Sequence, residues 1–157
     1  PSLFDVSRNY FQYVPHANTR FHTTDALTFV SRKSNAEEVY DLILLDIYID
    51  GPDNIIKNPV LWRKIKDILS PLGFCFTNVW RFDKHEECYQ QVLDISTALF
   101  KTTAQINMVT NQVILVNSDI DPKILDTKGV LDKTRFDELR TKVPLSRILS
   151  NTKILRK

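Results

Sequence analysis

Three carboxylates stand where an α/β protein would place chemically active groups. Asp46 closes an almost wholly apolar run over residues 40–46, Asp50 follows shortly after it, and Asp25 precedes a segment of helical character. In open α/β sheets, ligands bind outside the carboxyl ends of the strands. A carboxylate at that rim can accept a proton or bind an amine, and a pair of carboxylates suits a cationic substrate.

Each of these groups also has a purely structural interpretation. Asp46 and Asp50 could cap the elements that follow them or face water, and Asp25 could be a helix cap rather than an acceptor for the amino group of a bound base. Asn78, a polar residue within a predicted buried strand, fits either a place near the ligand or a satisfied core amide. The sequence favours Asp46 most clearly for chemistry.

Hydrophobic periodicity predicts the elements that must position these groups. Asn58 and Pro59 are typical of a helix start, and Asp83 with Glu86 has the spacing of a capping box. The pattern predicts helices over 2–13, 26–32 and 59–69, a long helix after Asp83, and strands over 20–24, 40–46, 74–80, 103–109 and 112–117. Thr110 and Asn111 would form the tight turn between the last two strands.

This alternation predicts an α/β fold with a doubly wound, Rossmann-like and mostly parallel sheet that ends in an antiparallel hairpin. Residues 1–118 would form this α/β unit. Residues 119–157 would form a C-terminal extension with a helix near 134–142 and a basic tail.

Composition excludes several classes of protein. The 157 residues contain only 3 glycines, and neither glycine-rich phosphate-binding motif occurs. The net charge of +2 does not indicate a polyanion partner, and no apolar stretch is long enough to span a membrane. Two cysteines without Cys-x-x-Cys spacing indicate reduced thiols of a cytoplasmic protein, and the three histidines are not spaced as metal ligands.

Several motifs together resemble the spermidine synthase (polyamine aminopropyltransferase) family, within the class I S-adenosylmethionine-dependent methyltransferase folds. The resemblance covers roughly residues 1–118 and implies that they form the C-terminal part of a nucleoside-binding transferase domain. It rests on Asp25-Ala26, the strand Tyr40-Asp41-Leu42-Ile43-Leu44-Leu45-Asp46, the segment Leu69-Ser70-Pro71-Leu72-Gly73-Phe74, and Asn78-Val79-Trp80.

The resemblance implies a role for individual residues. Asp25 and Ala26 would contact the adenine of the nucleoside, and Asp46 would be the catalytic carboxylate that orients and deprotonates the attacking amine. Asp50 and Tyr48 would help to hold the polyamine. No tightly bound cofactor is implied, because decarboxylated S-adenosylmethionine or S-adenosylmethionine acts as a co-substrate. The expected partners are small molecules rather than nucleic acid or membrane, and a homodimer is compatible with the sequence.

The chain also departs from the family pattern. Asp50 stands one residue late relative to the usual Asp-Ser-Ser-Asp, and Met108-Val109-Thr110-Asn111 replaces the family's loop before the last strand. Pro1-Ser2-Leu3-Phe4 resembles the continuation of a segment that follows the ribose-binding acid, so the family's first strand and Gly-x-Gly loop would lie outside this chain. Aminopropyl transfer is therefore the first expectation, with a methyltransferase on the same fold or a degenerate non-catalytic interaction module as alternatives.

Overall fold

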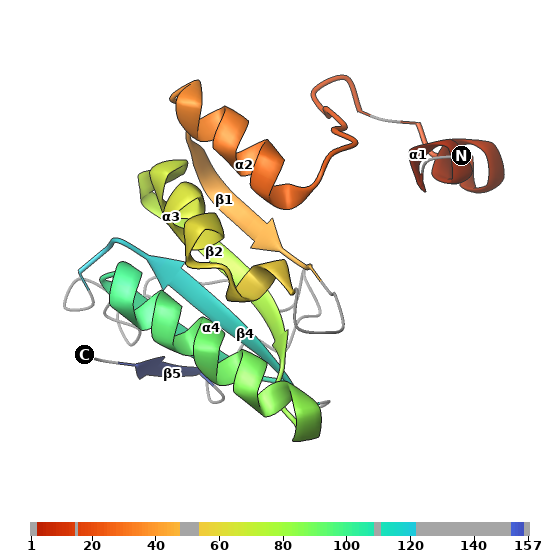
Figure 1. Ribbon diagram of the computed structural model, residues 1–157. Coiled ribbons are helices and arrows are strands. Elements are labelled where there is room, and N and C mark those ends of the chain that lie inside the picture. The colour runs from red at the N-terminus through yellow and green to blue at the C-terminus, as the bar shows by residue number, and fades with distance from the viewer. Residues whose placement is uncertain (1–2, 15, 48–53, 109–110, 122–151, 156–157) are drawn as a thin grey trace, which may run out of the picture.

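Five strands form one mixed sheet in the computed structural model, which describes residues 3–14, 16–47, 54–108, 111–121 and 152–155 (Figure 1). The strand order is β1-β2-β4-β3-β5, with bounds β1 Tyr40–Leu45, β2 Leu69–Trp80, β3 Thr102–Asn107, β4 Gln112–Ser118 and β5 Thr152–Leu155. β1 and β2 are parallel, and the other neighbouring pairs are antiparallel. The predicted α/β class and the antiparallel hairpin of β3 and β4 are confirmed, but the described sheet is mixed rather than mostly parallel, because β1 and β2 are its parallel pair.

β2 begins earlier than the sequence predicts. Residues 70–73, expected to end a helix and form a turn, lie inside this strand, and the pairing with β1 shifts register between Tyr40 and Leu42. Tyr40 is paired with Leu69, whereas Leu42 is already paired with Phe74. The irregularity places Pro71 in the bulged part of the strand, where a residue without an N–H group is tolerated.

Four α-helices and two short 3-10 helices connect these strands. Their bounds are α1 Leu3–Phe11, α2 Ala26–Asn35, η1 Ile55–Lys57, α3 Pro59–Asp67, η2 Asp83–His85 and α4 Glu86–Leu99. The cap predicted for α3 is confirmed, because the Asn58 side chain accepts a hydrogen bond from the Val60 backbone N–H at 2.9 Å. Residues 20–24, expected to be a strand, have no regular secondary structure.

The predicted capping box before α4 is wrong. Asp83 belongs to η2 and has a positive φ of 45°, and His85 precedes α4 without a side-chain capping hydrogen bond. The 3-10 turn takes up the residues that would otherwise have formed the cap. As a result, Glu86 becomes the first residue of α4 instead of the third, although it still complements the positive end of the helix dipole.

The helices α2, α3 and α4 lie together on one face of the sheet, whereas α1 lies apart from them (Figure 1). On β1, alternate residues differ accordingly: Leu45 is buried beneath the helices, whereas Leu42 and Leu44 are exposed on the opposite side. Tyr10 and Phe11, at the end of α1, are 80% and 78% exposed. The described core therefore lies between one face of the sheet and α2–α4.

Trp62 of α3 is the centre of this core. Its side chain is fully buried, its indole N–H donates to the Ile56 carbonyl at 2.7 Å, and its ring packs edge-to-face against Phe100 at 6.5 Å. One side chain thus joins α3 to the η1 loop and to the end of α4. Trp80, by contrast, is half-buried at the end of β2 and packs against Phe82.

A buried polar network joins α4 to the hairpin. Asn117 of β4 donates to the Ser96 hydroxyl at 3.2 Å and accepts from the Thr103 hydroxyl at 3.0 Å. All three side chains are at most 2% exposed. Because an unpaired polar group at this depth is costly, the network admits only one register of the hairpin against the helix.

The C-terminal extension contributes one strand to the sheet. Residues 152–155 form β5, which pairs with β3 so that Thr103 faces Leu155 and Ile106 faces Thr152. The helix expected near 134–142 lies outside the described residues, so it stays a prediction, as does a domain boundary at residue 118.

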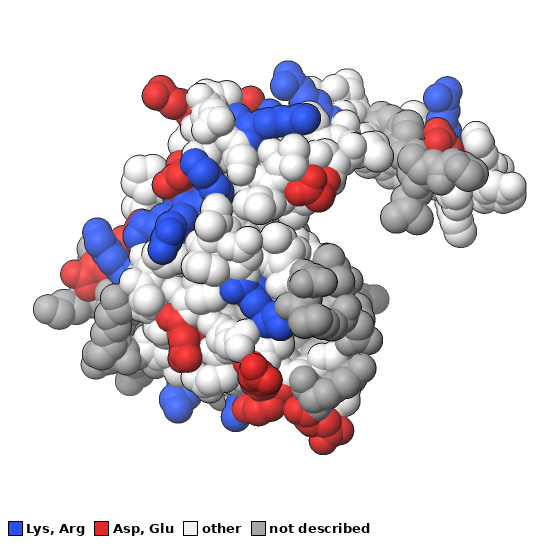
Figure 2. Space-filling view, in the orientation of Figure 1, with Lys and Arg blue, Asp and Glu red and all other residues white. Residues whose placement is uncertain are grey.

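The described helices are too short or too polar for a membrane-spanning segment. Basic and acidic side chains alternate over the face that α2–α4 present (Figure 2). Several of them pair, as Lys33 does with Glu38 at 2.7 Å and Lys64 with Asp67 at 3.6 Å. These exposed pairs contribute little to the free energy of unfolding.

We predict that Trp62→Phe lowers the free energy of unfolding by about 1–3 kcal/mol, because it removes the indole donor and leaves the buried Ile56 carbonyl unpaired. Urea unfolding followed by circular dichroism measures this change. Trp80→Phe is the matched control, with a smaller expected loss because that ring is half-buried. Equal losses in the two variants would contradict the central place of Trp62.

The two cysteines should differ in reactivity. Burial raises the pKa of the Cys75 thiol to about 11. Burial also raises the pKa of the Cys88 thiol, but this side chain is less buried than Cys75. Since the thiolate is the reactive form, we expect Cys88 to react with an alkylating agent in the native protein well before Cys75. Peptide mapping after timed alkylation at pH 8 measures both rates, and Cys88→Ala provides the control. Faster alkylation of Cys75 would contradict its burial.

Candidate functional site

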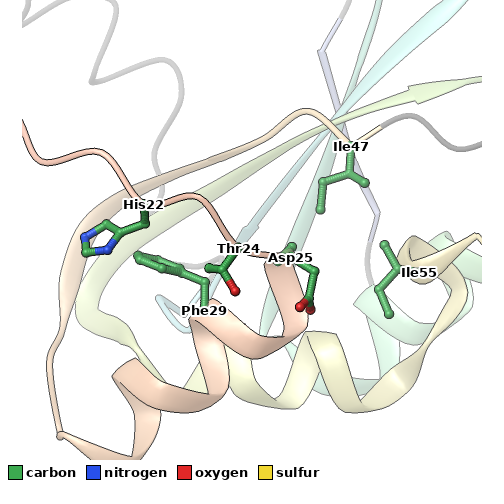
Figure 3. Close-up of a pocket in the computed structure, with 7 residues that line it drawn as sticks. His22, Thr24, Asp25, Phe29, Ile47 and Ile55 are labelled. Carbon is green, nitrogen blue, oxygen red and sulfur yellow. The ribbon is translucent and has the colours of Figure 1, made fainter. Parts of the chain in front are cut away.

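A cavity of about 660 Å³ opens beside the carboxyl end of β1 (Figure 3). Its volume lies within the range of small-molecule sites. The lining comes from the segment before α2, from α2 itself, from the residue that follows Asp46, and from η1; it comprises His22, Thr24, Asp25, Ala26, Phe29, Ile47 and Ile55. The predicted nucleoside contacts Asp25 and Ala26 therefore both lie in its wall.

Asp25 caps α2 and lines the cavity at the same time. Its Oδ1 atom accepts a hydrogen bond from the Thr28 backbone N–H at 2.8 Å, which is an N-cap geometry. Hydrogen bonds from the Thr28 side chain and backbone hold the pKa of the Asp25 carboxyl below its usual value. The carboxylate is thus anionic at neutral pH, and the cap fixes it as an acceptor at the cavity wall. The helix-cap interpretation is therefore confirmed, and contact of Asp25 with the amino group of a bound base stays a prediction.

Apolar and aromatic groups flank this carboxylate. His22 and Phe29 lie on one side of Asp25, with ring centroids 5.0 Å apart, and Ile47 and Ile55 lie on the other (Figure 3). A flat ring that carries an amino group could rest against these walls while its N–H donates to Asp25. Such a cavity, with apolar walls and few polar groups, fixes the orientation of a ligand.

Asp46 lies directly beyond the last residue of β1 and is exposed. One of its carboxylate oxygens, Oδ1, accepts a hydrogen bond from the Asn78 side-chain amide at 3.1 Å. The parallel register accounts for this contact, because Leu45 is paired with Thr77 and the next residue of each strand follows on the opposite face. The carboxylate predicted to be catalytic is therefore held at the rim of the sheet.

A second, much smaller hollow has a volume of about 20 Å³. That volume suffices for about one water molecule. Its lining comes mainly from the end of β2, from the η1 loop and from the start of α4. It comprises Ile47, Asn54, Ile56, Asn78, Val79, Trp80, His85 and Cys88. Ile47, the residue that follows Asp46, lines both hollows.

Two predicted substrate contacts, Tyr48 and Asp50, lie outside the described residues and stay predictions. The sequence did not single out His22, Phe29, Ile47 or Ile55, which line the large cavity. Phe29 carried a usable signal, because it follows Asp25 by one helical turn and therefore shares its face of α2. His22 precedes the helix in a segment without regular structure, and no spacing rule places it.

Within the part of the chain that the structure describes, no three His, Cys, Asp or Glu side chains are grouped closely enough to hold a metal ion. The charged group at the large cavity is Asp25.

Comparison with known proteins gives one sequence relative of interest. The chain is 30% identical over 86 residues to the polyamine aminopropyltransferase of Vibrio vulnificus (strain CMCP6). The match covers 54% of this chain and 28% of that protein, so the chain spans less than a third of the relative's length. No family model matches the chain.

A solved structure supports the fold. Human methyltransferase-like protein 13, in complex with SAH, matches the chain with a TM-score of 0.65 and 21% sequence identity, over 85% of this chain and 67% of that one. The chain thus has a class I methyltransferase-like, Rossmann-like fold, as predicted.

Proposed function

We propose that the complete protein transfers an aminopropyl group from decarboxylated S-adenosylmethionine to an amine. The observation that carries this proposal is the juxtaposition at the end of β1: Asp46 stands at the sheet rim, and the next residue, Ile47, lines a nucleoside-sized cavity that contains Asp25. A nucleoside in that cavity and an amine at Asp46 would meet at the same edge of the sheet.

The cavity suits the adenine end of the donor. The Asp25 carboxylate, kept anionic by its capping hydrogen bonds, would accept from the exocyclic amino group. The apolar side chains of Ile47 and Ile55 would cover the ring. The apolar side chains favour a flat ring, and the carboxylate favours a base with a hydrogen-bond donor on its edge.

Asp46 would bind the amine and remove its proton. In the reaction, the amine nitrogen forms a bond to the carbon beside the sulfonium, and the C–S bond breaks with its electron pair staying on sulfur. Methylthioadenosine leaves, and the Asp46 carboxylate takes the proton that the new secondary ammonium releases. Most of the rate enhancement would come from holding the two reactants in line.

The sequence match to the aminopropyltransferase of Vibrio vulnificus, over more than half of this chain, supports this proposal. The second candidate is methyl transfer from S-adenosylmethionine, and the likeness to human methyltransferase-like protein 13 in complex with SAH favours it. The two functions share the adenine site and differ in the group attached to the donor sulfur.

Asp46→Asn should lower turnover with decarboxylated S-adenosylmethionine and a diamine by about 10²- to 10⁴-fold, which is the usual contribution of a general base. Circular dichroism should show an unchanged fold. The matched control is Asp41→Asn in the same strand. Asp41 Oδ1 accepts a hydrogen bond from the Ser70 hydroxyl at 2.7 Å, away from the carboxyl end of β1, so this substitution should leave turnover unchanged.

The same assay, run with each donor separately, distinguishes the two candidates. Turnover with decarboxylated S-adenosylmethionine alone supports aminopropyl transfer, and turnover with S-adenosylmethionine alone would replace it with methyl transfer. Undiminished turnover in Asp46→Asn would remove that residue from the mechanism.

Asp25→Ser should separate capping from ligand binding, because serine is also a favoured N-cap residue but carries no carboxylate. We expect the variant to unfold at nearly the wild-type temperature without ligand. At a methylthioadenosine concentration a hundredfold above the wild-type Kd, the wild-type protein should gain ~2.7 kcal/mol, and a variant that binds tenfold more weakly only ~1.4 kcal/mol. Equal thermal shifts in the two proteins would show that the carboxylate does not contact the nucleoside.

A further inference from the structure

The side chain of Asn78 is satisfied at one end only. Its Nδ2 atom donates to Asp46 Oδ1 at 3.1 Å. Its Oδ1 atom is buried and has no hydrogen-bond partner, alone among the buried side-chain nitrogen and oxygen atoms in the described parts of the chain. Of the two alternatives that the sequence left open for Asn78, the satisfied core amide is therefore wrong. A place near the ligand stays a prediction.

Electrostatics fixes the orientation of this amide. If the Asn78 amide were flipped, its oxygen would lie beside the Asp46 carboxylate. Two hydrogen-bond acceptors would then face each other without a donor between them. The observed orientation directs the donor toward the negative charge, where a hydrogen bond is about twice as strong as one between neutral groups. The buried, unpaired oxygen is the consequence of that choice.

The orphaned oxygen makes Asn78 unfavourable for the strand. Leaving a buried acceptor unsatisfied lowers stability, and strand positions favour β-branched or aromatic side chains. The neighbouring residues on the same face of β2, Phe76 and Trp80, are of that kind. Asp46 itself is exposed, so water could solvate it without any protein donor. The fold therefore gains little from the amide.

We propose that Asn78 is a positioning residue for Asp46. The backbone of Asn78 is paired with Ile114 of β4 near the carboxyl end of β2, and the side-chain amide holds Oδ1 of the Asp46 carboxylate at a fixed place. Oδ2 is then left in one orientation to accept the N–H of the attacking amine and afterwards its proton. This inference rests on the proposed function of Asp46. In it, the Asn78 amide aligns the attacking amine with the donor carbon by fixing the Asp46 carboxylate.

Two substitutions in the complete protein test the role. Asn78→Leu removes the donor and the orphaned oxygen together, and Asn78→Asp keeps the shape but replaces the donor with a second carboxylate. The matched control is Ile114→Val, which alters packing at the cross-strand neighbour without touching Asp46. For each protein, kcat and KM for 1,4-diaminobutane, the Kd for methylthioadenosine and the thermal unfolding temperature are measured.

We expect kcat to fall about 10- to 100-fold in both Asn78 variants, because a misaligned reactant costs that much even when it still binds. The Kd for methylthioadenosine should stay within about twofold of wild type, because the Asp25 cavity is intact. The unfolding temperature of Asn78→Leu should be equal to or above that of wild type. Ile114→Val should keep the wild-type kcat.

Other results would overturn the proposal. A wild-type kcat in Asn78→Leu would show that Asp46 needs no positioning, and a fall in kcat together with weaker nucleoside binding and a lower unfolding temperature would show a merely structural role. If the wild-type protein transfers no aminopropyl group, the proposed function fails separately. The ¹³C resonance of the Asp46 carboxylate then decides: a shift between wild type and Asn78→Leu supports positioning, and an unchanged resonance overturns it.

Discussion

The parallel pairing of β1 with β2 is the constraint on which the candidate site depends. It brings the carboxyl ends of two strands to one edge, so that Asp46 and Asn78 meet although 32 residues separate them. The connection between the strands runs through α3, whose fully buried Trp62 fixes the helix on the sheet and binds the η1 loop beneath it. Ile55, in that same loop, lines the large cavity. Core packing and cavity geometry are therefore set by the same segment.

Local signals were sufficient for much of this arrangement. The apolar run before Asp46 predicts a strand and Asn58 with Pro59 predicts the start of α3, and both elements are present because neither depends on distant residues. The prediction that this strand is buried is wrong on one face, because Leu42 and Leu44 are exposed on the side away from the helices. The hairpin turn is equally local: Asn111 has a φ of 57°, a conformation that asparagine tolerates better than most residues. Asp25 could be recognised as a cap from its position alone, but its place in the cavity wall required the fold.

The failures arose where tertiary contacts override local preference. Residues 70–73 look like a turn, yet pairing with β1 recruits them into β2 across a bulge. Asp83 has the spacing of a cap, yet η2 occupies that point of the chain. His22 reaches the cavity from a segment with no periodic pattern, and the half-satisfied amide of Asn78 becomes visible only when both strands are in place. Contacts between residues that are far apart in the chain cannot be read from the spacing of residues in the sequence.

The pairing of β5 with β3 has a consequence for folding of the chain during its synthesis on the ribosome. Chains emerge with their N-terminal residues first, so β3 and β4 can fold into their hairpin well before residues 152–155 are made. During that interval the outer edge of β3 exposes a row of unpaired backbone N–H and C=O groups, which is the usual template for association between nascent chains. The arrival of β5 ends that interval, and translation speed over the intervening residues sets its length.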